Sequence, residues 1–232
     1  MTQIIKRSNW IIWRDVIFAL FVREIRTSFN DKFGIAWSVI NPVVFIFMLS
    51  YMRGRMDGGE THTVPTFVFM MYGMLLIQFF LGILNSVSGA IQKNKPLFAF
   101  RQVQPISSML AVSLFDILVK LFVFLVMLVI MYFLKMDISI SDPLRLILNF
   151  FLVGLIGFSL GCLFAIATCF VPEFKKIQSM LTRPFFFISA VFFSMQDIPA
   201  EYWYLFDWNP MVHAIELSRY AAYPSYGSAG VS

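Results

Sequence analysis

The sequence predicts an all-α integral membrane protein, and its composition and two long apolar runs support that fold class. Hydrophobic residues make up 59% of the 232 residues and charged residues only 13%, whereas soluble domains carry about 25% charged residues. The mean hydropathy is +0.77. Residues 66–90 contain no charged side chain, and residues 106–134 contain two. Each run is longer than the ~20 apolar residues that cross a hydrocarbon core.

Five transmembrane helices are expected, at residues 34–52, 66–90, 106–134, 146–170 and 177–195. Pro42 predicts a kink in the first, because proline removes a backbone donor. The fourth contains Gly154, Gly157 and Gly161, whose spacings of three and four place them on one stripe and predict close packing of a second helix. The fifth contains Arg183, which has to reach the membrane surface or face a wet cavity.

An amphipathic segment at residues 10–30 precedes the first span. Trp10 and Trp13 lie at its start, and Phe18, Phe21 and Ile25 recur at near-helical spacing. We expect an interface helix that lies in the headgroup region of the membrane. A short additional span is the alternative, which the charged residues of the segment make costly.

A basic linker at residues 91–105, IQKNKPLFAFRQVQP, joins the second and third spans. It is too apolar for a solvated loop, so either the membrane surface or a partner protein has to cover it. Its cations are Lys93, Lys95 and Arg101, and its large apolar side chains include Leu97, Phe98, Phe100 and Val103.

The distribution of charge predicts the orientation. If the spans alternate, 12 of the 18 cations fall on one side, in residues 1–33, 91–105 and 171–183. Five fall on the other side together with eight acidic residues. Cytoplasmic loops carry the excess of Lys and Arg, so the basic side and the N-terminus are expected in the cytoplasm. The net charge of +5 is then a topology signal, and no nucleic-acid footprint is left to explain.

The third expected span contains two charged residues, Asp116 and Lys120, which are four residues apart and therefore share a helix face. One interpretation is a neutralised ion pair that is tolerated near the cytoplasmic end. The other is a polar contact that lines a translocation path, because intramembrane charges face a cavity or a partner.

Residues 198–223 form an aromatic segment that Pro210 divides into two parts, each too short to span a membrane. Two short re-entrant helices, in the outer interface or lining a wet cavity, fit this composition and length. The rings of Tyr202, Trp203 and Trp208 are suited both to stacking on sugars and to an ordinary interfacial belt.

The motifs of common enzymes are missing from the sequence: it contains no P-loop, no GxSxG and no HExxH. His62 and His213 are far apart, and Cys162 and Cys169 fall in one apolar run, where they are expected to be small buried hydrophobes. We therefore expect no catalytic residue and no metal site, and any energy for transport has to come from another chain.

Three segments resemble the permease of ABC-2 type exporters: REIRTSFNDKFGIAWSVINPVVFIF (23–47), NKPLFAFRQVQPISSML (94–110) and WNPMVHAIELSRYAAYPSYG (208–227). In order, they resemble most the capsular polysaccharide exporter family of Gram-negative bacteria, the KpsM-like inner-membrane subunits. The resemblance covers essentially the whole chain. Members of that family end with a sixth span, whereas five are expected in these 232 residues.

The resemblance implies a homodimeric channel in the bacterial inner membrane that works with two copies of a separate ABC ATPase. That ATPase would bind ATP and magnesium, so no cofactor is expected in this chain. The implied substrate is a lipid-linked capsular polysaccharide that moves from cytoplasm to periplasm. Further implied partners are membrane lipid, a periplasmic adaptor and an outer-membrane export protein.

The same resemblance makes residues 93–104 a coupling helix that docks in the ATPase through the seven linker side chains named above. It makes residues 198–223 a periplasmic re-entrant segment at the channel exit. An anionic polymer would be repelled by the outer acids unless cations are brought to the path. The residues expected along the channel are Tyr202, Trp203, Trp208, His213, Arg219, Arg53, Arg55, Asp116 and Lys120.

Two other functions are kept as alternatives. One is an ABC-2 permease for a drug or a lipid, with the same architecture and a narrower path. The other is an ATP-independent membrane transporter or assembly protein, which copurification of an ATPase would eliminate. A neighbouring ATPase gene beside capsule glycosyltransferases would favour the polysaccharide exporter.

Overall fold

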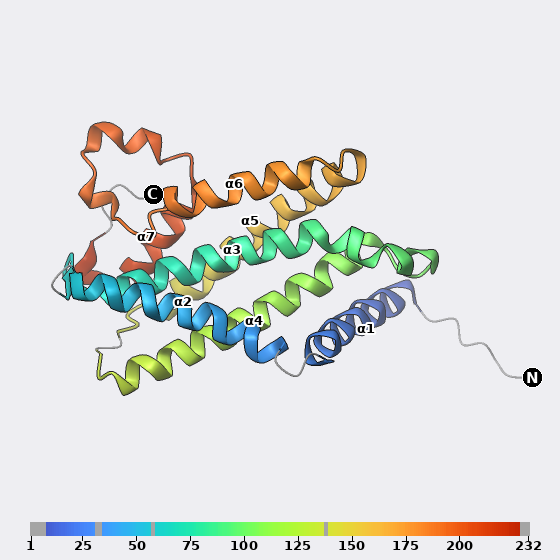
Figure 1. The fold of residues 1–232 in the computed structure, drawn as a ribbon, viewed down its shortest axis with the longest axis horizontal. Coiled ribbons are helices and arrows are strands. Elements are labelled where there is room, and N and C mark those ends of the chain that lie inside the picture. Colours follow the sequence, from blue (N-terminus) through green and yellow to red (C-terminus); the bar gives the residue numbers. More distant parts are fainter. Residues whose placement is uncertain (1–7, 31–33, 57–58, 137–138, 228–232) are drawn as a thin grey trace, which may run out of the picture.

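The computed structural model describes residues 8–30, 34–56, 59–136 and 139–227, and this part of the chain is helical almost throughout. Three of the cations counted above, in residues 1–7 and 31–33, lie outside it. Four described helices are long and apolar enough to cross a membrane, which agrees with the predicted fold class. They are α2 (Gly34–Met56), α3 (Thr66–Asn94), α4 (Pro105–Phe133) and α5 (Pro143–Phe170), and they run along the long axis of the molecule (Figure 1).

Helix α3 is the centre of the bundle and is buried along most of its length, while α2, α4 and α5 pack around it. The glycine stripe of α5 faces it, as predicted. A Cβ atom on Gly157 would lie 3.2 Å from the carbonyl oxygen of Phe80, and one on Gly161 would lie 2.8 Å from the Cβ of Val87. Both distances are shorter than an ordinary van der Waals contact. The absence of side chains on this stripe therefore permits the approach of α3 and α5.

The connections gather at two opposite ends of the bundle. At the linker end, the basic linker and the end of α3 lie beside α1 (Asn9–Asn30) (Figure 1). At the hairpin end, the turn between the strands β1 (Glu60–Thr61) and β2 (Val64–Pro65) contacts the segment that follows α6, and the start of α5 contacts the last residues before Tyr223. His62 Nε2 lies 2.7 Å from Asp197 Oδ1, and the backbone N–H of Asp142 donates to the carbonyl of Ala221 at 2.9 Å. Helices that cross a membrane one after another have their connections on alternate sides, and the two ends of this bundle fit that arrangement.

The fifth expected span, residues 177–195, is not a single helix. Helix α6 (Phe174–Ile188) has 15 residues, which corresponds to about 22 Å and falls short of a ~30 Å hydrocarbon core. It ends where the Ser189 hydroxyl donates to the carbonyl of Phe185 at 2.6 Å and Ala190 takes a φ of 55°. A left-handed residue just past the last turn is a common helix terminator. The prediction of five spanning helices is therefore not confirmed.

The segment expected to hold two re-entrant helices divides at Pro210, as predicted, but only its second part is an α-helix. Asn209 caps α7 (Pro210–Ala222) by accepting the backbone N–H of Met211 at 3.0 Å, and Pro210 occupies the first turn. The remaining elements are short 3₁₀ turns: η2 (Met195–Asp197), η3 (Ala200–Leu205) and η4 (Pro224–Tyr226). Helix α7 packs against α3 and α5, so most of its side chains are buried.

Candidate functional site

The basic linker projects from the linker end of the bundle. Residues 93–104, expected as one coupling helix, instead comprise the last turn of α3, the 3₁₀ helix η1 (Lys95–Ala99) and a turn. Pro96 breaks the helix, because proline lacks a donor and restricts the residue before it. Phe100 is 65% exposed, between the exposed cations Lys95 and Arg101, while the other large apolar side chains are half-buried. The linker thus presents one bare ring flanked by positive charge.

Helix α1 holds the start of this linker. Glu24 is buried, and its carboxylate pairs with the ammonium of Lys93. The guanidinium of Arg23 donates to the side-chain oxygen of Asn94 and lies 3.8 Å from Glu24. We call these four residues the α1 anchor. Lys93, which is expected to contact the ATPase, therefore also forms an ion pair within the subunit, and the sequence pattern does not indicate the roles of Glu24 and Asn94.

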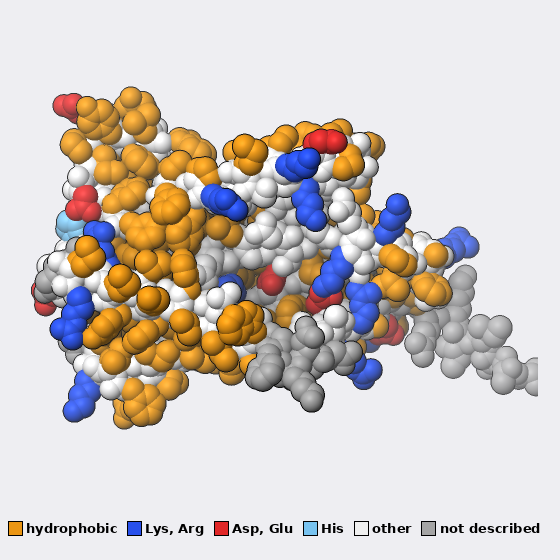
Figure 2. All heavy atoms as spheres, viewed as in Figure 1, with side chains coloured by type: hydrophobic (Ala, Val, Ile, Leu, Met, Phe, Trp, Pro, Cys, Tyr) orange, Lys and Arg blue, Asp and Glu red, His pale blue; other side chains and the backbone are white. Residues whose placement is uncertain are grey.

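The aromatic segment at the hairpin end has two kinds of ring. Tyr202 and Trp208 are 51% and 65% exposed. The indole N–H of Trp203 instead contacts the carbonyls of Met195 and Ile198 at 3.2 and 2.9 Å, so this ring holds the fold of its own segment. Figure 2 shows a hydrophobic surface over this region of the molecule. Exposed rings are available to a substrate or to lipid, whereas Trp203 is largely committed to the protein.

His213 of α7 is half-buried, and its Nε2 lies 3.0 Å from the carbonyl oxygen of Asp207. That hydrogen bond ties the start of α7 to the turn before it. Arg53 and Arg55 are exposed in the last turn of α2 at the hairpin end. The Arg55 guanidinium donates to the hydroxyl of Tyr51 at 3.0 Å and lies 5.4 Å from the centre of that ring. Both arginines therefore present positive charge at the hairpin end of α2.

Arg219 occupies a place that its predicted channel role does not fit. It is only 1% exposed, and its guanidinium lies 3.4 Å from the centre of the Phe69 ring. It donates to the carbonyls of Phe69, Val191 and Phe193 at 3.3, 3.1 and 3.3 Å and to Glu216 Oε1 at 3.0 Å. A buried arginine satisfied by carbonyls from two distant segments fastens the chain after α6 onto α3. The expectation that Arg219 lines the channel is corrected accordingly.

Glu216 is the counter-charge of Arg219 and is 2% exposed. Its Oε2 lies 2.7 Å from the hydroxyl of Tyr226, which is also 2.6 Å from Ser194 Oγ. Burial lowers the pKa of the Arg219 guanidinium from its ordinary value, and the Glu216 carboxylate opposes that shift. Burial also raises the pKa of the Tyr226 hydroxyl, which keeps it protonated. We call Arg219, Glu216 and Tyr226 the Arg219 clamp.

Helix α3 makes room for the clamp at Gly73. A Cβ atom there would lie 3.0 Å from Arg219 Nη2 and 3.2 Å from the Cα of Val191. The carbonyls that Arg219 contacts belong to Phe69, Val191 and Phe193, which are far from α7 in the sequence. Their meeting could not be deduced from spacing.

The expected ion pair between Asp116 and Lys120 is not formed within 4 Å in the described part of the chain. The Lys120 ammonium instead reaches α3 and donates to Gln78 Oε1 at 3.4 Å. Asp116 Oδ2 is buried and has no hydrogen-bond partner among the described residues. The shared helix face was predicted correctly, but a contact across the α3–α4 interface replaces the direct pair.

A profile of the ABC-2 type transporter family matches residues 15–223. The chain belongs to this family. The match includes most of α1, all four long helices, the basic linker and α7, so both ends of the molecule are part of the family architecture. In the described residues, no group of three His, Cys, Asp or Glu side chains is arranged to hold a metal ion.

Similar ABC-2 proteins carry names from capsule export. The chain is 32% identical over 227 residues to the polysialic acid transport protein KpsM of Escherichia coli, covering 97% of this chain and 88% of that protein. It is 24% identical to the capsule polysaccharide export inner-membrane protein BexB of Haemophilus influenzae, covering 88% and 78%. The corresponding protein CtrC of Neisseria meningitidis is also 24% identical, covering 90% and 79%.

Proposed function

We propose that this ABC-2 chain is the permease subunit of an ATP-driven exporter that moves lipid-linked capsular polysaccharide from the cytoplasm to the periplasm. The observation that carries the proposal is the alignment with a polysialic acid transport protein over 97% of the chain, because it includes both ends of the molecule. Four apolar helices suit a subunit of the inner membrane.

The basic linker is the proposed contact with a separate ATPase chain. An exposed ring flanked by cations outside the spans suits a groove on a soluble partner, where a buried aromatic side chain contributes strongly to binding. The α1 anchor would carry a displacement of the linker to α1 and α3, because Lys93 and Asn94 belong to both the linker and α3. The excess of cations at this end supports a cytoplasmic location of the linker and the N-terminus.

The assembly that we propose contains two copies of this chain and two of the ATPase, with a periplasmic adaptor and an outer-membrane protein continuing the path. Large apolar side chains on α2 and α6, such as Trp37, Met48 and Met180, are 60% to 73% exposed. Lipid and a second copy are the surfaces that would cover them.

The exposed rings of Tyr202 and Trp208 are proposed to contact the polymer near the exit.

Export in cells tests the proposal. The chain and its ATPase would be supplied to capsule-producing bacteria that lack their own permease, and polysaccharide at the cell surface would be measured. We expect surface polymer only when both chains are present and the ATPase is able to hydrolyse ATP. Polymer retained inside cells that contain the assembled complex, or export without the ATPase, would contradict the proposal.

A further inference from the structure

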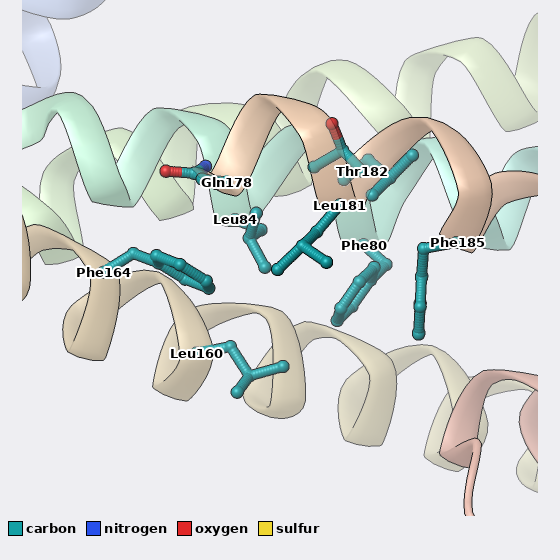
Figure 3. A pocket seen from close by; sticks show the side chains of 9 residues that line it. Phe80, Leu84, Leu160, Phe164, Gln178, Leu181, Thr182 and Phe185 are labelled. Carbon is teal, nitrogen blue, oxygen red and sulfur yellow. The ribbon is translucent and has the colours of Figure 1, made fainter. Parts of the chain in front are cut away.

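Two hollows between the helices differ in the side chains that line them. One, of about 160 Å³, lies under α6, between it and the helices α3 and α5, as Figure 3 shows, and the described residues that line it carry no charge. Gln178 in its wall already donates to Asn85 Oδ1 at 2.8 Å. The other hollow, of about 570 Å³, lies between α1 and α4 and includes the cation Arg14 in its lining. The second hollow therefore combines apolar walls with a positive charge.

The hollow between α1 and α4, which we call the α1–α4 groove, has a leucine wall and an aromatic wall. The two helices pack against each other near the linker end (Figure 1). Leu114, Leu118 and Leu121 of α4 are 45% to 54% exposed and share one helix face, because they are four and three residues apart. The apolar side chains that α1 contributes are Trp10, Trp13, Ile17, Phe18 and Phe21. The volume of the groove is within the range of small-molecule sites.

The α1–α4 groove begins near one boundary of the hydrocarbon core. Helix α4 ends at Phe133, and the rings of Tyr132 and Phe133 are 73% and 78% exposed, as in the aromatic belt at a membrane surface. Counting ~20 residues back from Phe133, across a ~30 Å core, reaches Leu114. Leu121 lies about 10 Å deeper than Leu114. The leucine wall therefore extends from the level of the lipid headgroups to that of the acyl chains.

Arg14 is the charged residue at the rim of the α1–α4 groove. Its side chain is 70% exposed, and one Nη atom lies 3.3 Å from Oδ1 of the neighbouring Asp15, which does not line the groove. An exposed ion pair of this kind is weak and exchanges readily. The guanidinium has five N–H donors in a planar fork that matches the geometry of a phosphate. Arg14 is therefore available to an anion seated at the rim.

Two indole N–H groups beside Arg14 are available as well. The rings of Trp10 and Trp13 have their centres 5.2 Å apart. Within the described residues, neither indole N–H has a protein acceptor, whereas those of Trp203 and Trp208 donate to backbone carbonyls. Indole rings at a membrane surface place the apolar ring among acyl chains and the N–H among polar headgroups. A lipid phosphate or ester oxygen is the acceptor that this position offers.

We infer that the α1–α4 groove binds a membrane phospholipid with an anionic headgroup. Its acyl chains lie along the leucine wall, and its phosphate contacts Arg14 and the two indoles. A basic pocket between membrane helices on the cytoplasmic side complements such a headgroup. The lipid fills the space between α1 and α4 and so holds α1, whose second half carries Glu24 of the α1 anchor. This ligand is a component of the membrane and is separate from the exported polymer.

Lipid binding to the intact chain in an uncharged detergent tests the headgroup contact. Native mass spectrometry would give the Kd of phosphatidylglycerol, which is anionic, and of phosphatidylcholine with the same acyl chains, which has no net charge. We expect phosphatidylglycerol to bind about fivefold more tightly, as expected for one arginine at an anionic lipid. Arg14→Gln should remove this preference, and Arg14→Lys should retain most of it. Arg26→Gln is the matched control, because Arg26 is exposed on the same helix outside the groove, and it should keep the preference within about twofold.

The acyl-chain contact is tested by filling the groove. Leu118→Trp should weaken the binding of both lipids at least fivefold, because the larger side chain occupies the space of the chains. Leu125→Trp is the matched control: Leu125 is 49% exposed, compared with 50% for Leu118, and follows it on the same face of α4 outside the groove. Its Kd values should stay within about twofold of those of the unaltered chain. Unfolding midpoints without added lipid would show that each variant is folded.

Several outcomes would overturn the inference. They are equal binding of the two lipids, an unchanged preference in Arg14→Gln, an equal loss in Arg26→Gln, and equal weakening by Leu118→Trp and Leu125→Trp. Thermal stabilisation by inorganic phosphate equal to that by phosphatidylglycerol would show a site for a free anion. A Leu118→Trp variant that changes the oligomeric state in light scattering and still binds phosphatidylglycerol would assign the groove to a second copy. Because these measurements use no polymer, they decide the lipid site whether or not the proposed function holds.

Discussion

The linker end and the hairpin end of this permease are stabilised in opposite ways. At the hairpin end, Arg219 and Glu216 are 1% and 2% exposed and join three segments through carbonyl, carboxylate and hydroxyl groups. At the linker end, η1 has no buried residue, Phe100 is bare, and the α1 anchor fixes only the start of the linker.

This difference indicates at which end the subunit itself covers its charged and apolar groups. A buried charge network that is fully satisfied holds its segments in a single arrangement. An exposed apolar ring gains stability only when something covers it. The hairpin end therefore satisfies its buried charges within the subunit, while the exposed ring at the linker end is suited to contact with a partner.

Breaking the Arg219 clamp should have the largest effect on stability. Glu216→Ala leaves a buried guanidinium without its counter-charge, and removing one partner of such a pair costs about 3–5 kcal/mol. We expect a large drop in the thermal unfolding midpoint of the purified protein in detergent. Glu201→Ala, at an exposed position in η3, is the control and should change stability by less than about 0.5 kcal/mol. Similar small losses in both variants would show that the clamp is unimportant.

The contact between α3 and α5 connects the two ends, and crowding it should have the next largest effect. Gly161→Val places methyl groups where a Cβ alone would lie 2.8 Å from the Cβ of Val87, so we expect a loss of about 1–3 kcal/mol. Gly89→Ala is the matched control because a Cβ there meets nothing within 4 Å, and it should be neutral or slightly stabilising. Unfolding curves of both variants decide the matter, and a neutral Gly161→Val would refute the close packing.

The α1 anchor should contribute a smaller and local effect. Glu24→Gln removes the charge that pairs with the partly exposed Lys93, and we expect a loss of about 1 kcal/mol. Hydrogen exchange should rise in the linker and at the end of α3, while the hairpin end keeps its protection. Asp15→Asn, at an exposed ion pair of the same helix, should change neither. Equal loosening at both ends would contradict a local anchor.

The smallest effect concerns pH at the hairpin end. Burial by itself raises the pKa of Asp197, but hydrogen bonds from the Ser194 backbone and His62 outweigh it and leave the pKa below its usual value. The ionised carboxylate therefore stabilises the fold above its unfolded pKa of about 3.9, and this contribution is lost as pH falls through the folded pKa. It should be less than ~1 kcal/mol because the side chain is half-exposed. The difference in unfolding midpoint between the unaltered protein and Asp197→Asn should begin to shrink below about pH 4 and disappear once the pH is below the folded pKa, and a difference that does not shrink would contradict this.

The sequence predicts the features of this molecule that depend on local pattern. Long apolar runs identify α2 to α5 because length and composition alone decide whether a helix can cross a membrane. The glycine stripe of α5 identifies a close helix contact because side-chain size limits approach. The basic linker identifies an exposed surface because its apolar rings have no periodic face to bury.

The features that depend on distant contacts are not predictable in this way. Arg219 resembles an outer cation in the sequence, yet carbonyls from residues 69, 191 and 193 surround it in the fold. The fifth span ends early because of the local geometry at Ser189 and Ala190, although the sequence stays largely apolar as far as Met195. Lys120 prefers Gln78 on a neighbouring helix to Asp116 on its own.

The most direct test of the account is ATP hydrolysis by the assembled complex after the bare ring of the linker is changed. Phe100→Asp should abolish association with the ATPase and its polymer-stimulated hydrolysis, by at least about tenfold, as expected for loss of a central interface residue. It should leave the unfolding midpoint of the permease nearly unchanged, because the Phe100 side chain is mostly exposed, and Phe100→Leu should retain most of the stimulation. If Phe100→Asp still binds the ATPase and supports full stimulation, the linker lies on lipid and the account of the two ends is wrong.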